Sequence, residues 1–202
     1  ALALGLPAAA TAQTAVDDFV IAVTNDRVDT VRAMLAKGVD PNVVGKDGHP
    51  ALVTAAREGS ANALDALLAA GAKVDARSGY GDTALMLAAL NGRLEIAKKL
   101  RAKGAALDYP GWTPLIYAAT GGHDEVVKYL LGEGAKINST SPNGTSALMM
   151  ATREGKFATA ELLIARGADV NHRNADGASA LTWAERNDDK ILAERLKRAG
   201  AK

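Results

Sequence analysis

Three patterns in this 202-residue chain could carry chemistry: a glycine-rich loop, three histidines and two glycosylation-like triplets. Gly79-Tyr80-Gly81-Asp82-Thr83-Ala84 has the spacing of a dinucleotide-binding loop, whose glycines let a pyrophosphate approach the start of a helix. Such a loop must follow a β-strand of a βαβ unit, whereas the residues before Gly79 indicate a helix and a turn. We therefore expect no dinucleotide cofactor.

The remaining chemical patterns are equally weak. His49, His123 and His172 do not form a metal-ligand spacing such as H-E-x-x-H, and the chain has no cysteine. Asn138-Ser139-Thr140 and Asn143-Gly144-Thr145 match the short glycosylation pattern, which arises often by chance. No nucleophile-elbow or phosphate-loop pattern occurs. We expect neither an enzyme nor a cofactor or metal site.

The elements that carry these residues are short helices, most clearly from Pro110 to Asn138. Thr113 is suited to cap the first helix, Pro114 to occupy its first position, and Gly121 and Gly122 to end it. A second helix follows and ends at Gly134. Each helix has fewer than about three turns, too few for stability alone, so the pair must pack against neighbours.

The same pair of helices recurs along the chain. The leucine at 115 and the terminal glycine both have counterparts: Leu52, Leu85, Leu148 and Leu181; Gly38, Gly71, Gly104, Gly167 and Gly200. Counted along the chain, the six glycines are 33, 33, 30, 33 and 33 residues apart. A period near 33 residues that holds a turn and two helices is that of ankyrin arrays.

The chain resembles the ankyrin-repeat family from about Asp17 to its end. The motifs are G-D-T-A-L-M-L-A-A-L-N-G-R-L-E-I-A at 81–97, G-W-T-P-L-I-Y-A-A-T-G-G-H-D-E-V-V at 111–127, and A-R-G-A-D-V-N at 165–171. The resemblance implies an all-α solenoid of stacked helix-turn-helix units with β-turn fingers. We expect a leader at 1–16 and a repeat domain at 17–202, with units at about 17–43, 44–77, 78–107, 108–140, 141–173 and 174–202.

Departures from the family pattern carry further expectations. Ser146 and Ser179 are expected to cap helices as Thr113 does, whereas Pro50 takes the place of that cap in the second unit. The family's T-P-L-H tetrad ends in a histidine that ties adjacent repeats, and the matching positions here are Val53, Met86, Ile116, Met149 and Thr182. We expect apolar packing to replace that tie. Three residues are missing between Asp108 and Gly111, which predicts a shortened finger.

The resemblance implies that the fingers and the ends of the first helices bind a partner protein. The finger residues are Tyr80, Asp82, Tyr109 and Trp112; the helix-end residues are Arg57, Glu58, Leu90, Asn91, Thr120, Arg153 and Glu154. Aromatic residues within a polar rim are typical of protein interfaces, with Tyr and Trp as hot spots.

Other interpretations of these residues remain open. Trp112 and Tyr109 could instead fold back to seal the shortened loop. A small molecule could bind between Tyr80, Tyr109 and Trp112, or the protein could be an accessory or inhibitory subunit of an exported enzyme. A closed pocket would favour the small molecule, and an open groove would favour a protein partner.

Composition and the first residues bear on partners and location. The net charge is +1 with charges interspersed, which argues against a nucleic-acid surface, and no apolar run is long enough to span a bilayer. Residues 1–16 resemble the end of a signal peptide, with Ala10-Thr11-Ala12 as the cleavage triplet before Gln13. We expect a monomeric, exported bacterial protein, periplasmic or secreted; the alternative is a flexible alanine-rich leader on a cytoplasmic protein.

Overall fold

The computed structural model describes residues 8–202, and these residues form twelve helices with two isolated antiparallel β-bridges, Val44–Pro50 and Thr140–Ser146. The predicted all-α class is confirmed. The helices are α1 (Ala8–Thr24), α2 (Val28–Ala36), α3 (Ala51–Glu58), α4 (Ala61–Ala69), α5 (Ala84–Leu90), α6 (Leu94–Ala102), α7 (Pro114–Gly121), α8 (Asp124–Gly132), α9 (Ala147–Arg153), α10 (Phe157–Ala165), α11 (Ala180–Arg186) and α12 (Lys190–Arg198).

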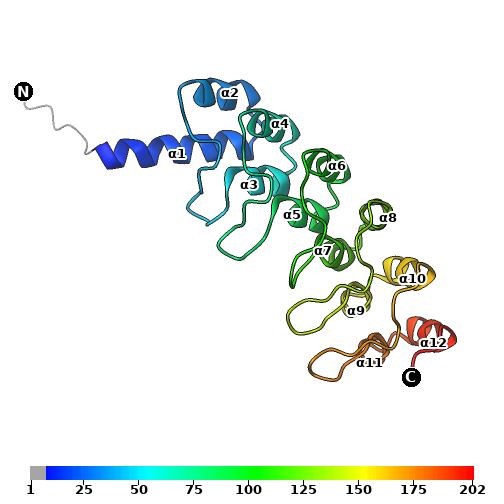
Figure 1. Cartoon of the computed structure of the whole chain (residues 1–202). Coiled ribbons are helices and arrows are strands. Elements are labelled where there is room, and N and C mark those ends of the chain that lie inside the picture. The colour runs from blue at the N-terminus through cyan, green and yellow to red at the C-terminus, as the bar shows by residue number, and fades with distance from the viewer. Residues whose placement is uncertain (1–7) are drawn as a thin grey trace, which may run out of the picture. The chain divides into compact units, whose positions relative to one another are not determined.

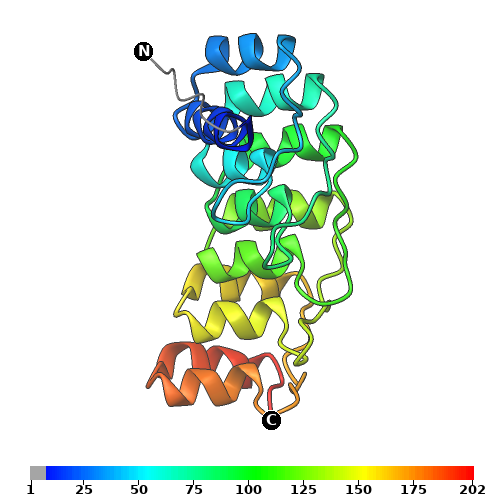
Figure 2. The same ribbon diagram turned by 90° about the vertical axis from the view of Figure 1, so that its left-hand side faces the viewer.

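Backbone packing divides the chain into two compact units. Among the described residues, the first comprises 8–85 together with Lys99–Ala105, and the second comprises Met86–Lys98 and Ala106–Lys202. In the first unit α1 packs against α2 and α3, and α4 packs against both of these. In the second unit α7, α9 and α11 form one row and α8, α10 and α12 another (Figure 1). Figure 1 looks nearly along the axes of these helices, and Figure 2 shows the helices from the side.

The predicted helix caps are confirmed at three helices. The hydroxyls of Thr113, Ser146 and Ser179 each accept from the backbone N–H three residues later, and Pro114 is the first residue of α7. Pro50 caps α3 without a side-chain bond, and the N–H of Ala51 instead donates to the carbonyl of Val43. The finger itself therefore satisfies the start of α3, because the Val44–Pro50 bridge brings Val43 to it.

The glycines that end the second helix of each pair all adopt left-handed backbone angles. Their φ values lie between 84° and 97°, a region costly for residues with a Cβ: Gly38, Gly71, Gly104, Gly134, Gly167 and Gly200. The N–H that follows each glycine bonds back to the helix, as Ala135 does to the carbonyl of Leu130 at 3.0 Å. At the end of α7 only Gly122 has a positive φ; Gly121, expected to share this role, is helical.

The helices enclose an aliphatic core. Leu115 is 1% exposed, and its counterparts Leu52, Leu85, Leu148 and Leu181 are also buried. Four positions that match the family histidine are buried and apolar, as expected: Val53, Met86, Ile116 and Met149. Thr182 serves instead in the capping box of α11 with Ser179.

A ladder of side-chain hydrogen bonds also links successive turns, which the sequence analysis did not anticipate. The side-chain carbonyl of Asn42 accepts from the N–H of Lys73 at 2.8 Å, and that of Asn138 accepts from the N–H of Asp169 at 2.9 Å. Asn171 accepts from the N–H of Lys202 at 3.0 Å. Polar ties between neighbouring helix pairs therefore exist, although not at the position where the family places its histidine.

Adjacent fingers are also tied to one another. The N–H of Gly79 donates to the carbonyl of Gly48 at 2.9 Å in the first unit. In the second unit the N–H of Ala175 donates to the carbonyl of Asn143 at 2.9 Å, and the Nε2 of His172 lies 2.7 Å from the carbonyl of Gly144. These bonds hold two pairs of adjacent fingers together, and one of these fingers carries the predicted binding residues Tyr80 and Asp82.

Candidate protein-interaction surface

In the first unit, Tyr80 is presented at the tip of its finger. The hydroxyl of Ser78 accepts from the N–H groups of Tyr80 and Asp82 at 3.2 and 3.1 Å, which folds the tip into a tight turn. The side chain of Tyr80 is 79% exposed, and its ring lies 5.7 Å from that of His49 on the preceding finger. A large aromatic ring this exposed on a fixed turn is available to a partner.

Arg57 and Glu58 lie at the end of α3 in a small charged network. The Nε of Arg57 donates to Glu58 at 2.8 Å, and its Nη2 donates to Asp47 at 3.1 Å. The other carboxylate oxygen of Asp47 accepts from the N–H of His49 at 3.2 Å. Burial raises the pKa of the Asp47 carboxyl, but the bonds from His49 and Arg57 outweigh this and hold the pKa below its usual value.

This network joins predicted residues that are far apart in the sequence. Tyr80 contacts His49, and His49 and Arg57 both bind Asp47. Asp47 and His49 were not predicted as members of this surface. The available signal was their place in the finger one period before Tyr80.

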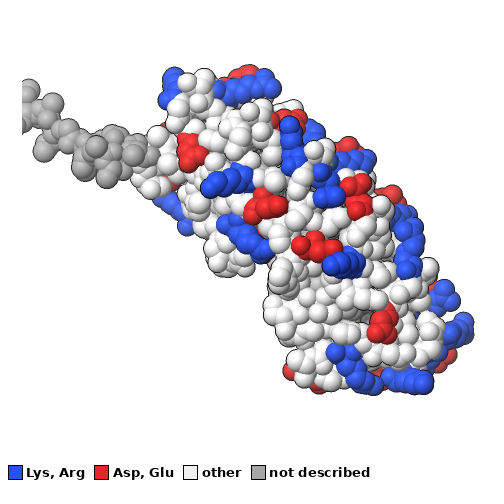
Figure 3. Space-filling model, in the orientation of Figure 1, with Lys and Arg blue, Asp and Glu red and all other residues white. Residues whose placement is uncertain are grey.

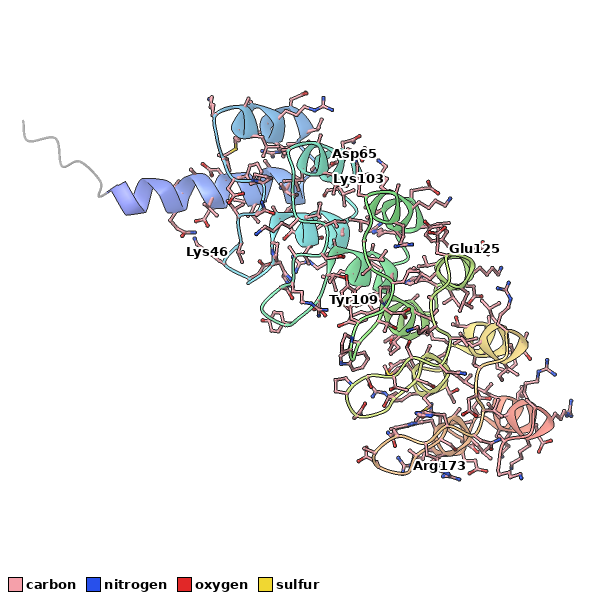
Figure 4. The ribbon with its side chains drawn as sticks, in the orientation of Figure 1. Lys46, Asp65, Lys103, Tyr109, Glu125 and Arg173 are labelled. Carbon is pink, nitrogen blue, oxygen red and sulfur yellow. The ribbon has the colours of Figure 1, made fainter. Side chains whose placement is uncertain are left out.

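In the second unit, Trp112 and Tyr109 flank the shortened finger. Trp112 is 39% exposed and packs edge-on against Tyr117 of α7, with ring centroids 5.8 Å apart. Tyr109 is half-buried in the loop that leads into α7 (Figure 4). Tyr117 is half-buried and supports the exposed tryptophan.

The uncharged helix-end residues Leu90, Asn91 and Thr120 all take part in hydrogen bonds within the protein. The carbonyl of Leu90 accepts from Nε2 of His123 at 2.8 Å, the Asn91 amide donates to Leu87, and the Thr120 hydroxyl donates to Ile116. A Cβ on Gly121 would lie 2.4 Å from the Leu90 oxygen, so glycine is required there. These residues shape the surface rather than offer free polar groups, and His123 has a structural role through its bond to Leu90.

Arg153 and Glu154 lie beside a tryptophan that the sequence analysis did not single out. The Nε of Arg153 donates to Glu154 at 2.9 Å. The guanidinium carbons of Arg153 and Arg186 lie 5.8 and 5.2 Å from the ring centre of Trp183, within the range of cation–π interactions. Arg186 follows Arg153 by one repeat period, and this spacing could have identified Arg186 as a residue of the same surface.

The predicted surface is thus divided between the two units: Tyr80, Asp82, Arg57 and Glu58 lie in the first, and the other predicted residues lie in the second. The hollows around Phe157 and Ile191 and around Val20 and Ile21 contain none of the three predicted finger aromatics. Among residues 8–202 no helix is long and apolar enough to cross a membrane, and no cluster of His, Asp and Glu has the arrangement of a metal site.

Helix pairs ended by left-handed glycines and joined by projecting, hydrogen-bonded turns define an all-α repeat protein. A family model described as ankyrin repeats in three copies matches residues 19–110, 77–141 and 115–201. These matches cover most of the sequence, so the chain belongs to the ankyrin-repeat family. The family suggests a protein-interaction module.

Individual relatives share only a short segment with the chain. M-phase phosphoprotein 8 from Rattus norvegicus, Mus musculus and Homo sapiens is in each case 38% identical over 52 residues. That segment is 26% of this chain but 6% of each relative, so the similarity concerns one short part of those proteins.

Proposed function

We propose that this chain is a non-enzymatic interaction module that holds a segment of a partner protein on its fingers and the ends of its first helices. The observation that carries the proposal is the exposure of Tyr80 and Trp112 at finger positions where the repeat fold does not require an aromatic residue. Because a hydrogen bond from Gly79 to the preceding finger fixes the loop of Tyr80, this anchor loses little conformational entropy on binding.

In each unit an arginine at the end of a first helix supports a partner with acidic groups next to the exposed aromatic residue. Arg57 and Arg153 each keep guanidinium N–H groups beyond those bound to the adjacent Glu58 and Glu154. Arg186, over the ring of Trp183, adds a further cation. Arginine recognises carboxylates well because it donates in a planar fork.

The test is site-specific photo-crosslinking in the native extract, followed by affinity measurement. A photoreactive phenylalanine analogue replaces Trp112 in one variant and the exposed Lys103 in a control, and mass spectrometry identifies captured proteins. We expect one protein to be captured from position 112 and not from position 103. For that protein, Trp112→Ala should weaken binding by about 2 kcal/mol or more without loss of helical signal. Unchanged affinity would reject this surface.

We also propose that the twelve helices form six repeats and that the protein is bacterial, exported and monomeric. Ala10-Thr11-Ala12 supports export as a cleavage triplet, and cleavage after it would leave a shorter α1 that begins at Gln13. The side chain of Gln13 donates to Asp17 at 3.0 Å, so the remaining helix would keep a bond within its first turns. Mass spectrometry of the native N-terminus tests this, and retention of Ala1–Ala12 would contradict it.

A further inference from the structure

A second surface lies on the α8–α10–α12 row, on the side of its unit away from the loops. A groove of about 450 Å³ runs along α10 and α12, and its apolar part is formed by Phe157 and Ile191. The two side chains are 36% and 71% exposed. Neither the fold nor the surface described above accounts for this exposure.

The repeat pattern itself shows that Ile191 is exceptional. Stepping back through the repeat, the equivalent positions hold Ala158, Glu125, Glu95, Asn62 and Asp29. All five are small or polar, and Glu125 faces solvent on α8 (Figure 4). An isoleucine is therefore not needed for helix packing at this position.

Charged side chains border the apolar part of the groove. Lys190, Glu194 and Arg198 line it at successive i, i+4 positions of α12, and thus follow one side of the helix. Arg195 is paired with Glu161 of α10 at 3.1 Å. Figure 3 shows Lys and Arg side chains gathered around this part of the second unit.

The order of these charges discriminates between occupants. A second copy that paired its α12 with this one, in either direction about the centre, would place Glu194 against Glu194. It would also place Lys190 and Arg198 against each other or against themselves, and all of these contacts are between like charges. A partner helix with acidic residues at both ends of the contact would instead be complementary.

We propose that this groove binds an amphipathic helix of a partner protein, with aliphatic residues against Phe157 and Ile191 and acidic residues facing Lys190 and Arg198. This mode of recognition lays the apolar face of a helix into a groove and reads its flanking charges. The groove lies apart from the finger surface of the same unit, so both can be occupied at once.

The experiment uses the full chain and two fluorescent model helices of about 18 residues, long enough to form in water. Both carry leucines on one face; one has glutamates and the other lysines flanking them. By fluorescence anisotropy we expect the Leu/Glu helix to bind at least about tenfold more tightly than the Leu/Lys helix. Amide shifts in NMR spectra should concentrate on α10 and α12.

Three variants give the proposal its controls. Ile191→Glu restores the residue type of Glu125 and should abolish binding of the Leu/Glu helix with unchanged circular dichroism. Ile21→Glu, at an exposed isoleucine of α1, should leave binding unchanged. The double change Lys190→Glu and Arg198→Glu should reverse the preference between the two helices.

Other outcomes overturn the proposal. Equal affinity for both helices, or binding that Ile191→Glu does not alter, would remove the groove as the site. A dimer in sedimentation that Ile191→Glu dissociates would make a second copy the occupant. Trp112→Ala should not affect helix binding, so this test and that of the finger surface fail independently.

Discussion

Two aspartates occupy backbone conformations that the inner repeats give to glycine. In the turn between the two helices of a pair, the equivalent residue has φ values of 89°, 66°, 79° and 65° at Gly59, Gly92, Gly122 and Gly155. In the first and last helix pairs this residue is Asp26 or Asp188, each with φ of 52°. The left-handed conformation costs a non-glycine residue roughly 1–2 kcal/mol, less for aspartate. Replacing each aspartate by glycine therefore tests how much its carboxylate contributes to stability.

The structure predicts opposite results for the two positions. The Asp26 carboxylate accepts from the N–H of Ala63 at 2.7 Å and from Asn62 at 2.8 Å, and so ties its turn to α4. Asp188 has only a 3.7 Å contact with Lys190, and both side chains are 84% exposed. A surface contact of this kind contributes little.

Asp188→Gly should therefore stabilise the C-terminal helix pair by about 0.5 kcal/mol, since relief of backbone strain exceeds the entropy of the added glycine. Asp26→Gly loses two charge-assisted hydrogen bonds and leaves the Ala63 N–H unpaired, so it should destabilise by about 1–3 kcal/mol. Asp26→Asn keeps an acceptor and tolerates the left-handed backbone, and should lie close to the parent.

Amide hydrogen exchange is the appropriate assay, because repeat arrays unfold unit by unit and a single unfolding midpoint would average the effects. Protection at Ala63 and along α4 should fall in Asp26→Gly, and protection along α12 should rise in Asp188→Gly. If both glycines stabilised their helices equally, the bonds of Asp26 would contribute nothing and the reasoning would be refuted.

Three further predictions concern the core, the ladder and pH. Leu115→Ala should destabilise by about 2–5 kcal/mol in urea unfolding, since Leu115 is 1% exposed; a loss under about 1 kcal/mol would contradict its burial. Asn138→Ala should remove the acceptor of the Asp169 N–H at a cost of about 1 kcal/mol, whereas Asn138→Asp should preserve it, and faster amide exchange at Asp169 only in the alanine variant is the expected result. Burial raises the pKa of Asp47, but its bonds from His49 and Arg57 lower it overall, so its stabilisation is present at neutral pH and lost as pH falls through the lowered pKa. Asp47→Asn should therefore destabilise at pH 7 and lose its effect in acid, and an effect that persisted in acid would show that the charge is not involved.

Local signals predicted the local structure. Thr113 and Pro114 begin α7, and Gly134 adopts the left-handed angle that ends its turn, because each depends on a few neighbouring residues. Gly121 was misassigned because two adjacent glycines offer the same freedom, and only the carbonyl of Leu90 decides which one must be helical. Leu90 belongs to another helix pair, so the residues around Gly121 in the sequence do not indicate where its carbonyl lies.

The contacts that assemble the surface could not be predicted in the same way. Asn138 binds the N–H of Asp169, and His49 contacts Tyr80, each pair 31 residues apart. The period of 33 residues predicts that such residues lie in neighbouring units, but not which atoms meet. Every residue except proline has a backbone N–H donor, so the bond from Asp169 does not require a particular residue type at that position.

The arrangement of hydrogen bonds also explains why the two proposed surfaces suit different partners. Fingers are joined through backbone atoms, as from Gly79 to Gly48 and from Ala175 to Asn143, so Tyr80 can vary in type without loosening its loop. The finger side chains, such as Tyr80, therefore determine which partner segment binds to this surface. The α10–α12 groove is built instead from side chains on rigid helices, and its cations Lys190 and Arg198 are eight residues apart on α12. At about 1.5 Å of rise per residue these cations are roughly 12 Å apart along the helix, a spacing that another helix reproduces with acidic residues in its own i, i+8 register.

An extended segment rises about 3.3 Å per residue, so it would match that distance only between side chains four residues apart. Those two side chains face the same way, but the few residues between them would leave the apolar strip of the groove half empty. The register of α12 therefore favours a helical partner over an extended one.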